Sequence, residues 1–379
     1  MKIAHVTDFY LPRLGGIEMQ VRDLAIRQAR AGHTVEVITS SPRPKGQRVS
    51  GGEELRVHRL TEKSIFPAAL NPAGLRPGRD LLRKGGYDVV HVQAAPFSPL
   101  AFSAVALASD AGLPTVLTLH SLISYLETPF RLLDGLVDWS SQPVTWTAVS
   151  DVAAEPLHRL VAPAPVHILP NGIDPTRWRV EPLPRDAEEV VVVAVMRLAR
   201  RKRPLHLLRT LREARAALKP SVRMKVVVVG EGPERPRMER YMRRHGMTGW
   251  VSLPGRLPRQ EIRTLFRRAD VFVAPATLES FGIAALEARC AGIPVVARAE
   301  GGVGGFVDDG LGGILASSDT AMAEAITLLA ADPGLRTSMA AHNRAVQPPM
   351  DWPAVLERTH RIYEIAAGRP SHVISKAVR

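Results

Sequence analysis

The segment Glu279–Glu287 (ESFGIAALE) contains the residue types that most directly suggest chemistry. It follows an apolar run, Val271–Ala274, and Ser280 or a neighbour can cap a helix that begins near Gly282. The first turn of such a helix presents unpaired backbone N–H groups and the positive end of the helix dipole. Because Gly282 also lets a ligand approach the backbone closely, the segment predicts a binding site for a diphosphate.

Two carboxylates flank this predicted anion site. Glu279 precedes the helix and Glu287 lies one to two turns inside it. Carboxylate oxygens accept hydrogen bonds from hydroxyl groups, so these side chains are suited to a sugar or a ribose. A capped amphipathic helix with two solvated glutamates has the same pattern, and the segment alone leaves both interpretations open.

A cluster of positive charge follows the first strand predicted in the second half of the chain. Arg197 and Lys202 come directly after the apolar run Val190–Met196. In open parallel sheets, ligands bind beyond the carboxyl ends of the strands. Two fixed cations at that position could neutralise the charge of a departing diphosphate without a metal. A solvated basic turn is the alternative interpretation.

The first half of the chain offers weaker candidates. Gly15 and Gly16 separate the first apolar run from a helical pattern, so their backbone could approach a phosphate or a sugar. His120 ends the strand-like segment Pro114–Leu119, which again is a carboxyl end. A tight turn and an ordinary core histidine are the structural alternatives for these residues.

Strand-like and helix-like segments alternate along the whole chain, which predicts doubly wound βαβ architecture. The apolar runs Lys2–Thr7 and Asp88–Val92 belong to a first series, and Val190–Met196 starts a second. Turn residues are dense in Leu169–Pro175, which places a linker near 171–187. We expect Rossmann-like domains over 1–178 and 187–350 with a ligand cleft between them, and a helix over 351–367.

Charge and cysteine content narrow the class of protein. The net charge is +13, and residues 197–268 contain 21 basic but only five acidic residues, which favours an anionic partner. The single cysteine, Cys290, excludes an internal disulfide. No apolar run reaches the roughly 18–20 residues of a membrane span, and the first residues lack a signal-peptide pattern. We therefore expect a cytoplasmic protein.

Several familiar motifs are missing from the sequence. There is no complete dinucleotide fingerprint, no Walker lysine loop, no His-Glu-x-x-His segment and no Asp-x-Asp pair at the end of a strand. We therefore expect neither a metal nor a cofactor. A nucleotide-sugar epimerase or dehydrogenase stays open as an alternative function, as does a basic nucleic-acid-binding protein, although no nucleic-acid motif is evident.

Taken in order, the segments resemble the retaining glycosyltransferases of family 4, which have the two-domain fold called GT-B. The resemblance covers nearly the whole chain, and the Glu279/Glu287 pair is its most specific feature. The other matching segments include Pro12–Glu18 (PRLGGIE), Pro170–Asp174 (PNGID), Gly230–Pro233 (GEGP) and Ala291–Val296 (AGIPVV).

The resemblance implies a role for each candidate residue. In the second domain, cations hold the donor diphosphate, carboxylates bind the donor sugar and the ribose, and backbone groups lie beside the phosphates. Those residues are Arg197 and Lys202, Glu279 and Glu287, and Phe281, Gly282 and Ile283, respectively. In the first domain, Gly15 and Gly16 approach the donor and His120 bonds a hydroxyl of the donor sugar.

Two departures from the family pattern affect these expectations. Arg203 stands where glycine commonly follows the lysine, and this puts the conformation of the local turn in question. Gly304-Gly305 replaces the usual Pro-Glu after Gly301-Gly302-Val303, which affects one edge of the donor pocket.

The reaction implied by the resemblance moves a hexosyl group from a nucleoside-diphosphate sugar to an acceptor hydroxyl with retention of configuration. Mannosyl or glucosyl transfer is favoured, while the donor base and the acceptor, whether lipid, glycan or small metabolite, stay open. The basic stretch could dock the protein on anionic lipids at the inner face of the cell membrane. Ser64–Leu70 (SIFPAAL) could add an apolar contact there.

Overall fold

The computed structural model describes residues 1–13, 15–42, 55–60, 72–123, 128, 130–131, 134, 140–184, 186 and 188–368, with the backbone alone for 72–76. The expected membrane contact at Ser64–Leu70 and the tail after residue 368 lie outside this part of the chain. The chain forms two compact units. The first comprises Met1–Gly172 and the chain from Trp352 onwards, and the second comprises Ile173–Asp351.

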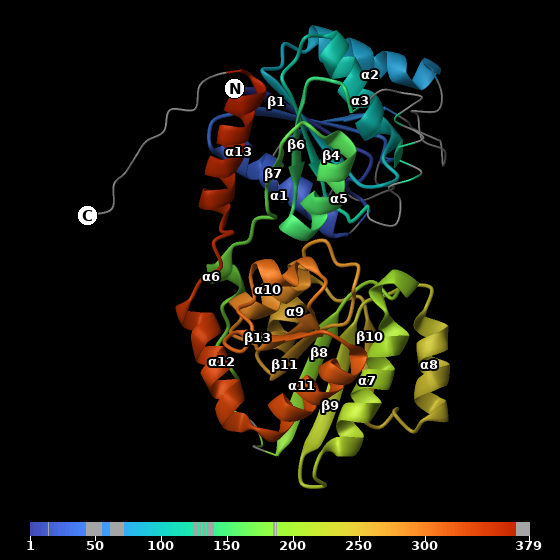
Figure 1. Cartoon of the computed structure of the whole chain (residues 1–379), viewed down its shortest axis with the longest axis vertical. Coiled ribbons are helices and arrows are strands. Elements are labelled where there is room, and N and C mark those ends of the chain that lie inside the picture. Colours follow the sequence, from blue (N-terminus) through green and yellow to red (C-terminus); the bar gives the residue numbers. More distant parts are fainter. Residues whose placement is uncertain are drawn as a thin grey trace, which may run out of the picture. The chain divides into compact units, whose positions relative to one another are not determined.

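The first unit is a parallel sheet with the strand order β3-β2-β1-β4-β5-β6-β7 (Figure 1). Its strands are β1 (Lys2–Thr7), β2 (Thr34–Thr39), β3 (Arg56–Arg59), β4 (Val89–Ala94), β5 (Thr115–Leu119), β6 (Val144–Ala148) and β7 (Val166–Ile168). Its helices are α1 (Gly16–Arg30), α2 (Pro72–Lys84), α3 (Pro99–Asp110), α5 (Asp151–Val161) and α13 (Trp352–Ala366).

One face of this sheet is covered by α1 and α13, which also contact each other. The apolar part of that face contains Ile3, Val89 and Val116, and Trp352 and Tyr363 of α13 pack in the same cluster. The last helix of the chain therefore completes the core of the first unit, although the whole second unit, Ile173–Asp351, precedes it in the sequence.

The first unit ends at Gly172, whereas the sequence pattern placed the end of the first domain at 178. The intervening segment contains the short helix α6 (Pro175–Trp178), which packs against α10 (Ile283–Cys290) of the second unit. Trp178 also lies beside Phe266, with 5.9 Å between the ring centroids. Turn residues mark where the chain changes direction, but the burial of Trp178 decides to which unit α6 belongs.

The second unit is a parallel sheet with the order β10-β9-β8-β11-β12-β13. Its strands are β8 (Glu189–Val195), β9 (Arg223–Val229), β10 (Val251–Gly255), β11 (Val271–Ala274), β12 (Val295–Arg298) and β13 (Gly313–Ala316). Besides α6 and α10, its helices are α7 (Pro204–Ala217), α8 (Arg235–Arg244), α9 (Arg259–Phe266), α11 (Asp319–Ala331) and α12 (Pro333–Ala345), with short 3₁₀ turns η2 (Arg200–Lys202) and η3 (Gly302–Gly305).

The composition of the strands explains why both sheets are parallel and enclosed. β8 (EVVVVAV) is almost entirely β-branched and buried, as is typical of a strand covered by helices on both faces. β8 also pairs along its full length with β9. Because all these strands run in one direction, their carboxyl ends lie along one edge of each sheet, and the loops that follow them can share a site.

The strands of the first unit are not apolar on both faces, as the sequence pattern indicated. In the register of β1 and β4, His5 lies opposite His91 and Thr7 opposite Gln93. Thr118 of β5 and Thr147 of β6 continue this row, and all of them are buried. The carboxyl half of this face is therefore a buried polar band that needs internal hydrogen-bond partners.

Candidate active site

The N-terminus of α10 presents open backbone N–H groups, as expected for an anion site. The helix is preceded by Gly282, and the first intrahelical bond is donated by the N–H of Leu286 to the carbonyl of Gly282. No side chain caps this end, in contrast to the expectation that Ser280 or a neighbour would do so. The N–H groups of the first turn therefore remain available to a ligand.

Glycine is required at position 282 for conformational and steric reasons. Its φ of 93° lies in the left-handed region, where residues with a Cβ are strained. A Cβ at this position would also lie 2.7 Å from Cγ2 of Val303. Phe281 before it is buried against Phe306, with ring centroids 5.5 Å apart, and Ile283 after it is half-buried. The backbone of this turn is therefore held between packed side chains.

Lys202 and Glu279, which the sequence assigned to the diphosphate and to the donor sugar, form an ion pair. Nζ of Lys202 lies 2.5 Å from Oε2 of Glu279, and the two side chains are 18% and 17% exposed. The loop that contains Glu279 is fixed in turn, because its carbonyl accepts a hydrogen bond from the N–H of Gly302. The pair places a cation and an anion, both still accessible to solvent, in the loops that follow β8 and β11.

Arg197 and Glu287 have different environments. Arg197 is exposed, and its guanidinium makes no ion pair with any residue that the structure describes. Glu287 in α10 is only 7% exposed, and its Oε1 lies 4.0 Å from Nε of Arg259 in α9. The sequence pattern gave no indication of Arg259, because α9 is separated from α10 by a strand and a loop.

The Gly230–Pro233 motif positions the segment that contains Arg197. The N–H of Met196 donates to the carbonyl of Val229, and the N–H of Leu198 donates to the carbonyl of Glu231. Gly230 has a φ of 139°, and a Cβ there would lie 1.8 Å from the carbonyl oxygen of Met196. The motif therefore lets the chain after β9 run closely beside the chain after β8.

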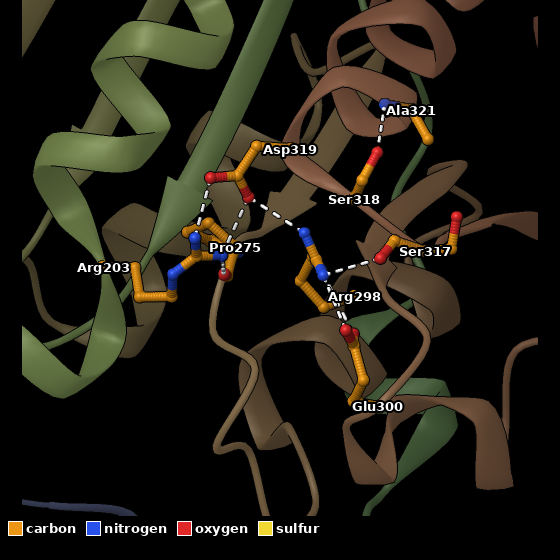
Figure 2. A network of polar contacts seen from close by, with 8 residues as sticks. All are labelled: Arg203, Pro275, Arg298, Glu300, Ser317, Ser318, Asp319 and Ala321. Atoms are coloured by element: carbon orange, nitrogen blue, oxygen red, sulfur yellow. Dashed lines mark hydrogen bonds and ion pairs between the residues drawn. The ribbon is translucent and has the colours of Figure 1, made fainter.

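Arg203 connects the lysine turn to three other strand ends (Figure 2). Its guanidinium donates two hydrogen bonds to the carboxylate of Asp319, at 2.9 and 2.7 Å, and a third to the carbonyl of Pro275, at 3.1 Å. Arg298, the last residue of β12, donates to the same carboxylate at 2.9 Å. Asp319 therefore joins the segments that follow β8, β11, β12 and β13.

This cluster also explains how the turn forms without the family's glycine after Lys202. Arg203 adopts the left-handed conformation, with φ 56° and ψ 41°, that glycine commonly takes. Burial alone would raise the pKa of the Asp319 carboxyl, but the hydrogen bonds and charges of Arg203 and Arg298 bring it below its usual value. Asp319 is thus an anion fixed between two arginines. The sequence pattern identified Arg203 only as a departure and gave no sign of Arg298 or Asp319.

In the first unit, the Gly15-Gly16 turn approaches a side chain of the protein itself. Gly15 precedes α1, and a Cβ on it would lie 2.4 Å from Oε2 of Glu18. Glu18 is 4% exposed and pairs with Nε of Arg13 at 2.9 Å. A carboxylate near the first turn of a helix is favoured by the helix dipole, so the glycine makes room for Glu18.

His120 is buried at the end of β5 and bonded to polar neighbours. Its Nε2 lies 2.6 Å from Oε1 of Gln93, and Asn171 is a second side-chain partner. Burial lowers the pKa of His120 to about 4, with a smaller opposing effect of the Asn171 hydrogen bond. The imidazole is therefore neutral at neutral pH.

A small cavity of about 20 Å³ borders His120 within the first unit. Its polar lining includes Gln20, Gln93, Thr118 and Asn171. The main chain of Gly172, which forms another part of the wall, is bonded through both its N–H and its carbonyl to the amide of Gln20. The space suits a group the size of a water molecule or a hydroxyl.

Two further features bear on what this site can hold. Within the described ranges, no group of three or more His, Cys, Asp or Glu side chains is gathered closely enough to bind a metal ion. In the same part of the chain, no helix combines the length and apolar character that a bilayer span requires.

Comparisons with known proteins agree with this arrangement. The model of the glycosyl transferases group 1 matches residues 179–346, and the model of Glycosyltransferase Family 4 matches residues 14–177. The two matches correspond closely to the two structural units. The chain belongs to the family 4 glycosyltransferases and has the GT-B fold, which confirms the resemblance derived from the sequence.

Individual relatives extend over nearly the whole chain. One of these relatives, from the phosphatidylinositol N-acetylglucosaminyltransferase of Arabidopsis thaliana, is 27% identical, covering 97% of this chain and 82% of its own length. The glycogen synthase of Mycobacterium tuberculosis and the phosphatidyl-myo-inositol mannosyltransferase of Mycolicibacterium smegmatis are each 28% identical, covering 97% of this chain and 95% of their own length. The structure of Anabaena Alr3699/HepE in complex with UDP-glucose matches with a TM-score of 0.74 at 18% identity, covering 97% and 100%.

Proposed function

We propose that the protein is a retaining hexosyltransferase that uses a nucleoside-diphosphate mannose or glucose. The observation that carries this proposal is the Lys202–Glu279 ion pair beside the uncapped first turn of α10. Lys202, Arg197 and the N–H groups of the turn would bind the diphosphate. Glu279 would accept hydrogen bonds from the sugar and Glu287 from the ribose. The first unit would contribute His120 to a sugar hydroxyl.

In the proposed reaction, the acceptor hydroxyl attacks the anomeric carbon on the face from which the diphosphate leaves. The bond from the anomeric carbon to the phosphate oxygen breaks as the bond to the acceptor oxygen forms, and the departing phosphate oxygen takes the hydroxyl proton. No pair of carboxylates spaced as in retaining hydrolases is needed. Lys202 and Arg197 would stabilise the negative charge that grows on the leaving group.

We propose a membrane lipid with a polyol headgroup as the acceptor. Two of the three relatives described above act on inositol lipids according to their names, whereas the third, a glycogen synthase, supports a glucan acceptor instead. Both acceptor classes offer secondary hydroxyl groups, so they can be tested in one assay.

The arginines of α7 and α8 support an encounter with anionic lipid, on the membrane surface that faces the cytoplasm. The two helices pack against each other in the second unit. They present an arginine face whose exposed members are Arg209, Arg212, Arg240 and Arg244. Arg212 also reaches His245 at the end of α8, with 2.8 Å between its Nη1 and the ring Nδ1. A basic surface gains about 1 kcal/mol per exposed cation near an anionic leaflet.

A panel of UDP- and GDP-sugars tests this proposal directly. We expect transfer from one mannose or glucose donor to phosphatidylinositol in phosphatidylcholine vesicles, with the product keeping the donor's anomeric configuration. We also expect full activity in excess EDTA. Transfer only to glycogen would replace the lipid acceptor with a glucan, and nicotinamide reduction or DNA binding without sugar transfer would replace the proposed function.

Lys202→Ala tests the role of the ion pair. Removing a charge that stabilises the transition state commonly costs about 3–4 kcal/mol, so turnover is expected to fall roughly a hundred- to a thousandfold. Lys219→Ala is the matched control, because this exposed lysine follows the opposite end of α7. Turnover of Lys202→Ala equal to that of Lys219→Ala would remove Lys202 from the mechanism.

A further inference from the structure

A continuous series of hydrogen bonds between buried side chains runs through the first unit, from His120 to a main-chain carbonyl. Its members come from β1, β4, β5, β6, α1 and α13, and each is at least nine-tenths buried. The proposed function uses only one of them, His120. The series therefore needs a physical explanation of its own, because buried polar groups are costly unless each has a partner.

The series begins at His120 and first crosses to β1. Nε2 of His120 lies 2.6 Å from Oε1 of Gln93, and Nε2 of Gln93 lies 3.3 Å from Nδ1 of His5. Nε2 of His5 then lies 2.7 Å from Oε1 of Gln28 in α1. Each ring nitrogen in this part therefore faces an amide group whose oxygen and nitrogen can serve as acceptor and donor.

The series passes next through the last helix of the chain. Nε2 of Gln28 donates to the hydroxyl of Tyr363 in α13 at 3.0 Å, and that hydroxyl lies 2.8 Å from Nδ1 of His91. The rings of Tyr363 and His91 meet edge to face, with 5.5 Å between their centroids. Tyr363 is thus the only contribution of α13 to the series within the described residues.

The far end of the series fixes its direction. Nε2 of His91 lies 2.7 Å from the hydroxyl of Thr118, which lies 2.6 Å from the hydroxyl of Thr147. The hydroxyl of Thr147 donates to the carbonyl of Leu117 at 3.1 Å. A carbonyl can only accept, and each hydroxyl has a single proton. Thr147 must therefore accept from Thr118, and Thr118 must accept from Nε2–H of His91.

The same reasoning continues back to His120. Burial lowers the pKa of His5 to about 4 and that of His91 well below its ordinary value, so both rings are neutral and each has one acceptor nitrogen. His91 then receives the proton of Tyr363 at Nδ1, and Tyr363 accepts from the amide of Gln28. Gln28 consequently accepts from Nε2–H of His5, whose Nδ1 accepts from the amide of Gln93. Gln93 then has only its oxygen left for His120.

We infer that this series of hydrogen bonds holds His120 as the Nε2–H tautomer, with Tyr363 of α13 as a positioning residue for it. Nδ1 of His120 is then an acceptor, so it can receive a hydrogen bond from a hydroxyl but cannot donate a proton to a leaving group. Where this inference concerns sugar transfer it rests on the proposed function. The tautomer itself does not depend on any substrate.

Histidine-selective ¹⁵N NMR of the full chain tests the inference without a ligand. At neutral pH we expect the ring signals of His5, His91 and His120 to show the Nε2–H tautomer. Assignment by single His→Gln variants identifies each signal. A proton on Nδ1 of any of the three rings would overturn the inference.

Tyr363→Phe tests whether α13 controls the tautomer. The variant keeps the ring but removes the hydroxyl that orients Gln28, so this amide can turn over and reverse the bonds to His5, Gln93 and His120. We expect His120 to become a mixture of tautomers. Tyr10→Phe is the control, because Tyr10 is buried in the same core cluster but its hydroxyl takes no part in the series. A pure Nε2–H signal for His120 in Tyr363→Phe would show that the series does not position it.

Thr147→Val provides a second variant in case Tyr363→Phe folds poorly. It removes the anchor at the Leu117 carbonyl, at the end of the series far from His120, and the same mixture is expected at His91. In both variants we expect sugar transfer to slow by about tenfold, as for a lost hydrogen bond, with unchanged affinity for the nucleoside diphosphate. If no donor supports transfer by the wild type, the proposed function fails, and the NMR signals still decide the inference.

Discussion

At the scale of single residues, Arg203 combines a strained backbone with a fixed side chain. A residue with a Cβ in the left-handed region costs roughly 1–2 kcal/mol relative to an ordinary conformation. Its three hydrogen bonds to Asp319 and Pro275 offset this cost. The next residue towards the N-terminus is Lys202, so the conformation of Arg203 also determines where the lysine begins. The arginine can therefore replace the family's glycine without loss of the turn.

Arg203→Gly should separate the two roles of this residue. Glycine relieves the backbone strain but loses the bonds to Asp319, so we expect the free energy of unfolding to change by no more than about 1 kcal/mol. We expect the affinity for a nucleoside diphosphate, measured by titration calorimetry, to fall about tenfold because Lys202 is no longer held.

The controls for Arg203→Gly follow from its contacts. Arg209→Ala removes an exposed charge from α7 and should leave the affinity unchanged. Asp319→Asn should reproduce most of the loss, and the double variant should be no weaker than the worse single variant, because both changes remove the same contact. Additive losses would show that Arg203 and Asp319 act independently.

At the scale of elements, the start of α10 depends on how its neighbours are packed. Phe281 is fixed by Phe306, and Gly282 lies against Val303 at the start of η3. The segment Gly301–Gly305, where the sequence departs from the family pattern, therefore supports the turn through Val303. Its glycines 304 and 305 have ordinary backbone angles, so the departure does not loosen the start of α10 by itself.

Gly282→Ala should disturb this turn. The new Cβ adds the strain of a positive φ and also meets Val303 at 2.7 Å, so we expect a loss of about 2–3 kcal/mol of stability. The affinity for the nucleoside diphosphate should fall by more than tenfold because the N–H groups move. Gly246→Ala is the matched control: its φ is +60°, but no atom lies within 4 Å of the added Cβ. Equal effects of the two variants on affinity would contradict the assignment of α10.

At the scale of the whole molecule, the buried histidines couple folding to pH. The pKa values of His5 and His120 are about 4 in the folded protein and about 6.5 when unfolded. Between these values the unfolded chain binds protons that the folded chain does not. The resulting stability is fully present above pH 6.5 and is lost as the pH falls towards 4.

Urea unfolding at a series of pH values measures this coupling. We expect the free energy of unfolding to fall below pH 6.5 by about 1.4 kcal/mol per pH unit for each of these histidines. His5→Gln should remove one such contribution to the slope, whereas His158→Gln, at an exposed position, should not. An unchanged slope in His5→Gln would mean that His5 is protonated in the folded state.

Much of this fold could be predicted from sequence because its determinants are local. β-branched runs such as Val190–Val195 form strands covered on both sides, and helical segments between them force a parallel order. Parallel strands place their carboxyl ends at one edge, so the positions of Arg197, Lys202 and Glu279 followed from their place after a strand. The start of α10 was predicted within a residue, since Gly282 marks it.

Only the tertiary structure decided which of these groups meet. Arg203 and Asp319 are 116 residues apart, and His91 and Tyr363 are 272 residues apart. Such contacts depend on how helices and sheets pack, and local periodicity contains no information about that packing. The sequence by itself determined the two Rossmann-like units and the loops with chemically useful residues. The pairing of Lys202 with Glu279, the bracing of Arg203 and the series of hydrogen bonds to His120 required the packed fold, because hydrogen bonds depend on distances that only packing sets.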